Sequence, residues 1–158
     1  MDNKDICIKD GNEKFNFRVA AVLRYNNKIL IQKGKKDNFF SLVGGRVRLG
    51  EKTIEALIRE IKEEINLVVS EEKCKLMRVC ENFFEFDSKK FHEILFIYSV
   101  EINEQDEIEK EKEFVCFDKP TTKMLWINEN DVEELEIRPK ETKNIIHDNN
   151  LKHLVITK

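Results

Sequence analysis

Residues 44–67 read GGRVRLGEKTIEALIREIKEEINL, and this stretch decides how the rest of the chain is interpreted. Within it, apolar side chains recur at helical spacing and form one stripe, made of Ile54, Leu57, Ile58, Ile61 and Ile65. The pattern predicts an amphipathic helix over residues 53–66, with Thr53 as its N-cap. Asn66 stands where a helix-ending residue in the left-handed conformation is expected.

The same helix carries an acidic face. At about 100° per residue, Glu60, Glu63 and Glu64 fall together on one side, and Glu60 and Glu64 are one turn apart. Like charges at that spacing cost about 0.2–0.5 kcal/mol per pair, and the helix dipole also disfavours anions near the C-terminal end. A divalent cation would explain this placement, because hard oxygen ligands suit Mg²⁺ or Mn²⁺. A merely solvated Glu-rich face, with Arg59 and Lys62 offsetting the repulsion, is the alternative.

The segment before the helix makes the pattern specific. The stretch resembles the Nudix box, G-x5-E-x7-R-E-U-x-E-E-x-G-U, where U is a bulky aliphatic residue. The matching fixed positions are Gly45, Glu51, Arg59, Glu60, Glu63 and Glu64, with Ile61 and Leu67 at the aliphatic positions. The box has Gly where this chain has Asn66, and Asn is the next-best residue for a left-handed helix end.

The resemblance implies a role for each residue of the box. Glu60, Glu63 and Glu64 would hold Mg²⁺, with Mn²⁺ as a possible substitute and the Gly44 carbonyl as a further ligand. Arg59 would pair with Glu51 and orient the helix against the preceding loop. The bound metal would activate a water for attack on phosphorus.

The proton acceptor for that water is a separate question. It is either a Glu of the box or an acid from elsewhere in the chain. Glu93 is the main candidate outside the box, because Glu93, Leu95, Ile97 and Ser99 share one face of a predicted strand. Glu85 is a weaker candidate, and for both residues an ordinary exposed Glu is the alternative.

Outward from the box, the chain alternates between strand patterns and polar turns. Strands are expected over residues 15–25, 28–33, 39–43, 75–86, 91–102, 123–128 and 151–157, with Gly44-Gly45 ending the third and a turn at 87–90. Residues 103–112 are strongly charged and predict a loop, and Pro139 is expected to begin a last helix that runs through about His147. The resemblance covers about residues 15–147 and implies an α/β/α sandwich around a mixed sheet. We expect one domain over residues 1–158.

Composition limits the partners. The formal net charge is −3, which gives no basic footprint for nucleic acid and disfavours an RNA 5′-end pyrophosphohydrolase. No apolar stretch approaches the ~20 residues of a membrane span, and MDNKDICIKD has no apolar signal core, so a cytoplasmic location is expected. Four cysteines without a C-x-x-C pair predict reduced thiols rather than structural zinc. The sequence leaves the oligomeric state open, a homodimer included.

The expected function is Mg²⁺-dependent hydrolysis of a diphosphate linkage in a small nucleotide-like substrate, a nucleoside diphosphate linked to X. Nucleoside triphosphates, nucleotide sugars and ADP-ribose all stay open as substrates. The segment ENFFEFDSKKFHEILFIYSV, residues 81–100, also resembles a bacterial Nudix subgroup with an N-F-F…H-E-I pattern, but no substrate class follows from it. The alternative is a non-catalytic Nudix-like module that binds a nucleotide as a regulator.

Aromatic side chains are candidates for binding the organic part of the substrate. Phe39, Phe83 and Phe84 are able to stack a base, although Phe at strand positions is more often core. His92, His147 and His153 are expected to be surface or structural residues rather than catalytic ones.

Overall fold

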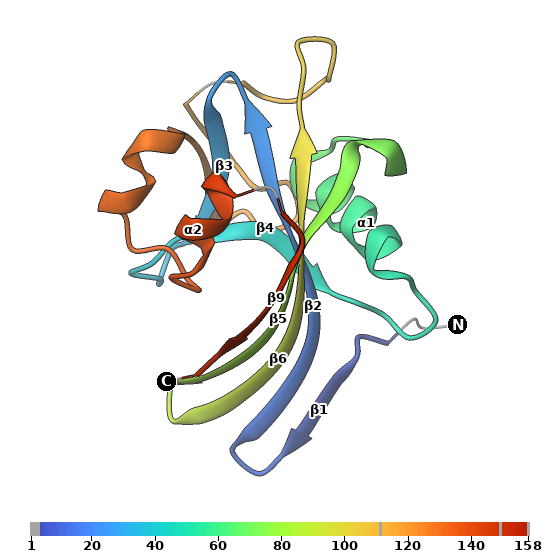
Figure 1. The fold of residues 1–158 in the computed structure, drawn as a ribbon, viewed down its shortest axis with the longest axis vertical. Coiled ribbons are helices and arrows are strands. Elements are labelled where there is room, and N and C mark those ends of the chain that lie inside the picture. The colour runs from blue at the N-terminus through green and yellow to red at the C-terminus, as the bar shows by residue number, and fades with distance from the viewer. Residues whose placement is uncertain (1–3, 111, 149, 158) are drawn as a thin grey trace.

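The computed structural model describes residues 4–110, 112–148 and 150–157. A strongly curved sheet separates two helical layers, with α1 against one face and α2 against the other (Figure 1). The strands are β1 (Cys7–Asp10), β2 (Glu13–Tyr25), β3 (Lys28–Gly34), β4 (Ser41–Arg46), β5 (Cys74–Phe86), β6 (Lys89–Glu101), β7 (Glu113–Val115), β8 (Thr122–Asn128) and β9 (Lys152–Ile156). The helices are α1 (Thr53–Ile65), α2 (Thr142–His147) and two short 3₁₀ segments, η1 (Glu71–Lys73) and η2 (Glu129–Glu134).

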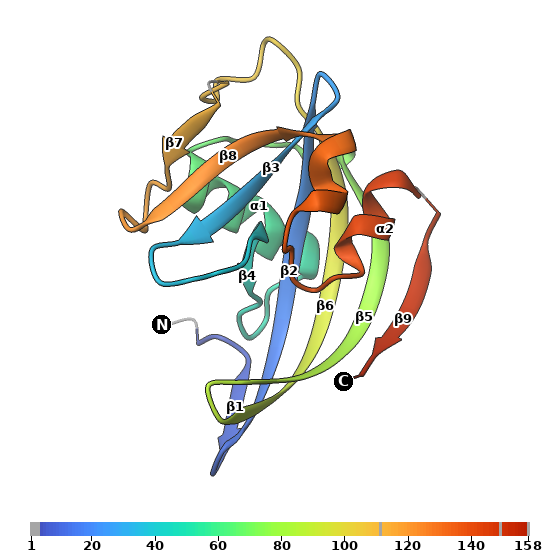
Figure 2. The same ribbon diagram turned by 90° about the vertical axis from the view of Figure 1, so that its left-hand side faces the viewer.

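The described residues form one mixed sheet of nine strands in the order β7-β8-β3-β4-β2-β6-β5-β9, with β1 added beside β2. β2 and β6 run parallel from the pair Glu13–Lys90 to the pair Arg24–Glu101. β5 and β9 are also parallel, whereas the other neighbours are antiparallel. The long strands β2, β5 and β6 extend well past both helices, with β1 alongside them (Figure 2). This confirms the mixed-sheet α/β/α sandwich.

Two cores follow from the alternation of side chains along the central strands. In β2, Val19 and Ala21 point toward α1, whereas Ala20 and Val22 point toward η2 and α2. The predicted stripe of α1 completes the first core: Leu57, Ile61 and Ile65 are buried, and Ile54 and Ile58 are partly buried. Because both faces are covered there, β2 is apolar in every position from Val19 to Leu23.

The tight turns also have local causes. Asn26 and Asn27 have φ values of 47° and 59° between β2 and β3, and Asp87 and Ser88 have φ values of 52° and 59° between β5 and β6. Positive φ at both central residues matches the twist of the strands that such a hairpin joins. The predicted turn at 87–90 is therefore shorter than expected, and β6 begins at Lys89 rather than Phe91.

α1 begins at Thr53 as predicted, but the N-cap predicted for α1 and the start predicted for α2 are both wrong. Lys52 is the N-cap of α1, and its backbone N–H donates to the Glu55 carboxylate at 2.9 Å. The Thr53 hydroxyl instead hydrogen-bonds the Tyr98 hydroxyl at 2.6 Å. α2 begins at Thr142, not at Pro139. The segment before Pro139 is extended, because the Arg138 N–H donates to the carbonyl of Phe40 at 2.9 Å.

The end of α1 is as predicted, since Asn66 has φ 54° and ψ 31°. The sequence did not predict β1, β7, η1 or η2, and none of the described helices is long and apolar enough to span a membrane.

Candidate active site

Two glycines bring the backbone of β4 against the acidic face of α1. A Cβ on Gly44 would lie 2.1 Å from the Val19 carbonyl oxygen, and one on Gly45 would lie 2.2 Å from the carboxyl carbon of Glu60. A side chain on Gly44 would force β2 away, whereas one on Gly45 would displace the Glu60 carboxylate. The sequence predicted that these glycines end the strand, and this is wrong. β4 continues through both glycines and pairs with β2 up to Arg46.

Arg59 fixes α1 to the loop that precedes it. Its Nε and Nη2 donate to the two carboxylate oxygens of Glu51 at 2.7 and 3.0 Å, which is a bidentate pair. Nη2 also donates to the Arg46 carbonyl at 2.9 Å, and Nη1 donates to Glu60 at 2.7 Å. The hydrogen bond that Arg59 donates to Glu51 raises the pKa of Arg59 above its usual range.

Glu51 closes this network from the other side. Burial alone would raise the pKa of its carboxyl, but the Arg59 guanidinium and the Arg48 backbone N–H outweigh burial and lower that pKa. The Arg48 N–H donates to the carboxylate at 2.9 Å. The predicted Glu51–Arg59 pair is thus present and positions the helix.

The three remaining acids of the box differ in burial. Glu64 is fully buried, Glu60 is 8% exposed, and Glu63 lies at the helix surface. Burial raises the pKa of Glu64 to about 7. Its oxygens accept from the Lys119 ammonium at 3.0 Å and from the Gly44 backbone N–H at 3.3 Å.

These acids suit a divalent cation by chemistry, although among the described residues no three acidic, His or Cys side chains converge on one point. Each acid is instead already paired with a cationic side chain. Arg59 contacts both Glu60 and Glu63, and Lys119 contacts Glu64. Hard oxygen donors of this kind suit Mg²⁺.

A cleft of about 490 Å³ lies on the opposite face of the sheet from α1, and it reaches β4 at Gly44 and Arg46. The Arg46 side chain lines the cleft, while its backbone carbonyl accepts from Arg59. Cationic side chains are prominent in the lining, namely Lys14, Arg18, Arg46, Arg138 and Lys140. A cleft lined with positive charge suits phosphate groups.

Glu93 lies in this cleft. It shares a face with Leu95 and Ile97, as predicted. That face is opposite to the one covered by α1, and the role of Glu93 as proton acceptor stays a prediction. Alternation along a strand fixes which residues share a face, but it does not fix which layer covers that face.

Of the predicted aromatic residues, Phe39 and Phe84 line the cleft. Phe83 instead points to the other face of the sheet. It stacks on His92, with 4.3 Å between ring centroids, and the edge of Phe15 meets the same His92 ring at 5.1 Å. His92 is therefore a structural residue, as expected.

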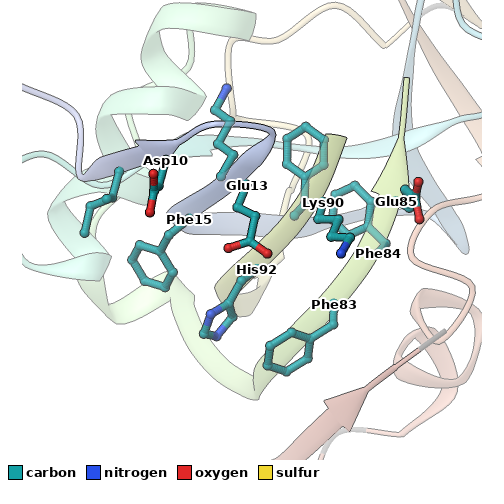
Figure 3. Close-up of a pocket in the computed structure, with 11 residues that line it drawn as sticks. Asp10, Glu13, Phe15, Phe83, Phe84, Glu85, Lys90 and His92 are labelled. Atoms are coloured by element: carbon teal, nitrogen blue, oxygen red, sulfur yellow. The ribbon is translucent and has the colours of Figure 1, made fainter. Parts of the chain in front are cut away.

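This aromatic group belongs to a second concavity of about 750 Å³ near the ends of the long strands (Figure 3). Phe15 of β2, His92 of β6 and Phe83 of β5 lie in a row, with His92 in the middle. The acids of the box line neither concavity, and the cleft is the candidate site because it reaches Gly44 and Arg46 on β4.

The other titratable residues named from the sequence lie outside the cleft. His153 pairs with Glu81, and Glu85 is exposed in the second concavity. The side chain of His147 is outside the described part of the chain. All four cysteines are free thiols, and burial raises the pKa of Cys80 to about 11 and that of Cys116 to about 12.

Several site residues were missed from the sequence: Asn16, Arg18, Arg46, Asn82, Lys119 and Arg138. They come from separate strands and loops and form no local pattern. For two of them the sequence holds a signal, because Asn16 and Arg18 alternate in β2 just before its apolar run.

A mixed sheet between two helical layers, with an acidic helix held against a strand that contains two glycines, defines an α/β/α sandwich. A family model described as the NUDIX domain matches residues 15–148, and the chain therefore belongs to the Nudix family. Nudix hydrolases generally cleave the pyrophosphate linkage of nucleoside diphosphates linked to a second group, and they generally use divalent metal ions.

Solved structures share the fold. The MutT protein from Bacillus halodurans is 18% identical, with a TM-score of 0.69 over 87% of this chain and 86% of that one. A Nudix hydrolase from Nitrosomonas europaea is 15% identical, with a TM-score of 0.60 over 90% of this chain and 79% of that one.

One curated relative matches over a shorter stretch. An ADP-ribose pyrophosphatase from Methanocaldococcus jannaschii is 45% identical over 53 residues, which is 32% of this chain and 31% of that protein. The match thus spans about a third of that relative's length.

Proposed function

We propose that the chain hydrolyses the diphosphate linkage of a small nucleoside diphosphate linked to X, with Mg²⁺ bound by Glu60, Glu63, Glu64 and the Gly44 carbonyl. The observation that supports this most is the contact between β4 and α1, where Gly45 leaves space for the Glu60 carboxylate. Mn²⁺ has the same preference for oxygen ligands and is expected to replace Mg²⁺.

When bound, the metal would neutralise phosphate charge and lower the pKa of a water. The chain's own residues do the rest. Arg46 lies where the cleft meets β4 and is placed to bind a phosphate by paired hydrogen bonds. Arg59 and Glu51 keep the acids of the box in position.

A carboxylate has to accept the proton of the attacking water, and the candidates are the acids of the box and Glu93. Attack on phosphorus in line with the leaving oxygen then breaks the diphosphate linkage and gives a nucleotide and phosphorylated X. Arg59 stays protonated throughout, because Glu51 and Glu60 stabilise its charge.

The test is a substrate panel of nucleoside triphosphates, nucleotide sugars and ADP-ribose, scored for phosphate or nucleotide release. ADP-ribose is included because of the curated relative that matches over 53 residues. Activity on the best substrate should vanish with EDTA and return with Mg²⁺ or Mn²⁺. Full turnover in metal-free buffer would contradict the proposed metal site.

A non-catalytic nucleotide-binding module is the alternative function. It is disfavoured because every acidic position of the box is present. The Glu60→Gln variant distinguishes the hydrolase from the non-catalytic module, because this substitution should remove turnover if the chain is an enzyme. A protein that binds nucleotides with Mg²⁺ yet hydrolyses none of the panel would favour the module.

A further inference from the structure

The cleft contains a buried carboxylate with loose contacts. Glu93 is only 5% exposed, yet its hydrogen bonds are long: the Asn16 amide donates at 3.3 Å and the Asn82 amide at 3.5 Å. The Arg18 guanidinium lies 3.6 Å away. A normal N–H···O bond is about 2.9 Å, so these contacts leave much of the carboxylate's capacity to accept hydrogen bonds unused.

A donor with unused capacity lies beside it. The Nε of Arg18 is buried and makes no hydrogen bond within the described part of the chain. Arg18 and Glu93 both line the cleft. Buried polar groups that lack good partners are costly, and here a strong acceptor and a strong donor face the same space.

Aromatic rings flank these two groups. Phe84 and Phe91 stack on each other, with 4.8 Å between centroids and 1° between planes. Phe39 lies under the Arg138 guanidinium, whose carbon is 4.5 Å from the ring centroid. Phe39, Phe84 and Phe91 line the same cleft, whose volume of about 490 Å³ lies within the usual range for small-ligand sites. Such walls suit a flat heterocycle.

We propose that Glu93 and Arg18 recognise the hydrogen-bonding edge of a guanine base. The N1–H and the 2-amino group of guanine are adjacent donors, and the two oxygens of a carboxylate accept from both. The O6 carbonyl beside them is an acceptor and meets the guanidinium of Arg18. Asn16 and Asn82 then serve as positioning residues, because their amides hold the carboxylate from behind.

Other bases fit this edge less well. Adenine offers one donor next to an acceptor nitrogen, and that nitrogen would face a carboxylate oxygen. Cytosine has the same mismatch, and uracil has a single donor between two carbonyls. A site built to accept two hydrogen bonds rejects an analogue that lacks them, since the buried carboxylate is then left unpaired.

This assignment rests on the proposed function in one respect, namely that the cleft takes the nucleoside part of the substrate. The same cleft extends to Gly44 and Arg46, so the phosphates of a nucleotide whose base lies beside Glu93 have room toward β4. In this role Glu93 binds the base and is not the proton acceptor.

The experiment is calorimetric binding of GMP, IMP and AMP to the full chain. These nucleotides have no diphosphate linkage and are not consumed. GMP should bind at least about tenfold more tightly than AMP, because each good bidentate pair gives discrimination of that order. IMP, which lacks only the 2-amino group, should fall between them. Equal affinity for GMP and AMP, or no measurable binding of GMP, would overturn the proposal.

The matched variants are Glu93→Gln and Glu101→Gln. Glu101 is exposed and lies at the other end of the same strand. Glu93→Gln should bring the affinities for GMP and AMP to within about threefold, because one carboxylate acceptor becomes a donor. Glu101→Gln should keep the wild-type ratio. A GMP preference that survives Glu93→Gln also overturns the proposal, and if that variant fails to fold, the wild-type ranking decides.

Turnover separates the remaining possibilities. If Glu93 is the proton acceptor instead, Glu93→Gln will lower kcat by about 10²–10⁴-fold for every substrate and leave GMP binding unchanged. A GMP preference without hydrolysis of any substrate would contradict the proposed function alone. Hydrolysis with no preference between bases would contradict this inference alone.

Discussion

At the scale of single residues, Glu64 is a proposed metal ligand whose burial affects stability. Its carboxylate is fully buried, and burial raises its pKa to about 7, against an ordinary value of 4.5. The folded chain therefore binds more protons than the unfolded chain between those two values. By linkage, Glu64 makes the metal-free protein less stable as the pH rises from about 4.5 to about 7.

Glu64→Gln should remove this dependence. We expect the variant to lose most turnover, because a ligand is gone, while its Tm in EDTA at pH 7.5 is unchanged or raised. The measurement is Tm against pH from 4.5 to 8 for both proteins, and the variant should show the flatter curve. A drop of several degrees at pH 7.5 would mean that the pair with Lys119 is a structural contact.

Gly45 provides a second test at this scale. In Gly45→Ala, the new methyl group would overlap the Glu60 carboxylate, so α1 or its side chains have to move. Positioning errors near 1 Å cost on the order of 10²-fold in rate, and we expect a loss of that size in kcat. Gly34→Ala is the control, because its methyl would meet only the end of the Asp37 side chain. Equal activity in both variants would show that the close approach at Gly45 is unimportant.

At the scale of elements, the end of α1 depends on one residue. Asn66 adopts φ 54°, and its side chain accepts from Lys62 at 2.7 Å at the surface. Asn66→Gly should be neutral to within a few tenths of a kcal/mol, whereas Asn66→Val should destabilise by roughly 1 kcal/mol or more, because a β-branched residue strongly resists positive φ. Urea unfolding measures both. Equal stability of the Val and Gly variants would contradict a left-handed Asn66.

The elements that the sequence predicted are those with a strong local period. α1 and the long strands β2, β5 and β6 carry such periods, and the Nudix box fixes how α1 meets β4. β1 was missed because it is four residues long and mostly exposed, so no apolar alternation marks it. The start of α2 was misplaced because the extended segment before it depends on pairing with Phe40, which is distant in sequence.

The candidate site divides in the same way. Glu51, Arg59 and the acids of the box lie within one motif, and the Glu51–Arg59 pair forms as expected. The residues of the cleft do not lie within one motif. Asn16, Asn82 and Glu93 meet only after three strands have paired. Periodicity placed Glu93 on a face with Leu95 and Ile97, but it could not say whether that face lies against α1.

At the scale of the whole molecule, β4 separates the acidic face of α1 from the cleft, and Arg46 contributes to both. Its carbonyl holds Arg59, while its side chain donates to Asn16 at 3.1 Å in the cleft. Arg46→Ala should lower kcat/KM by about tenfold or more through the lost phosphate contact, with the carbonyl contact kept. Steady-state kinetics measures this, and Arg46→Lys should restore part of the loss. Unchanged kinetics in Arg46→Ala would exclude a phosphate contact.

The parallel pairing of β2 with β6 has a consequence for the order of assembly. Asn16 and Glu93 are 77 residues apart in sequence, so the chain has to close a long loop before this pair forms. Closing a loop of that length costs conformational entropy before the pair contributes any stabilising contact. Topologies rich in such pairings fold in milliseconds to seconds rather than microseconds. The helix α1 and the β2–β3 hairpin are local and can form early. A nascent chain would then have its box helix before its cleft, and selectivity between bases would arise only at the last stage of folding.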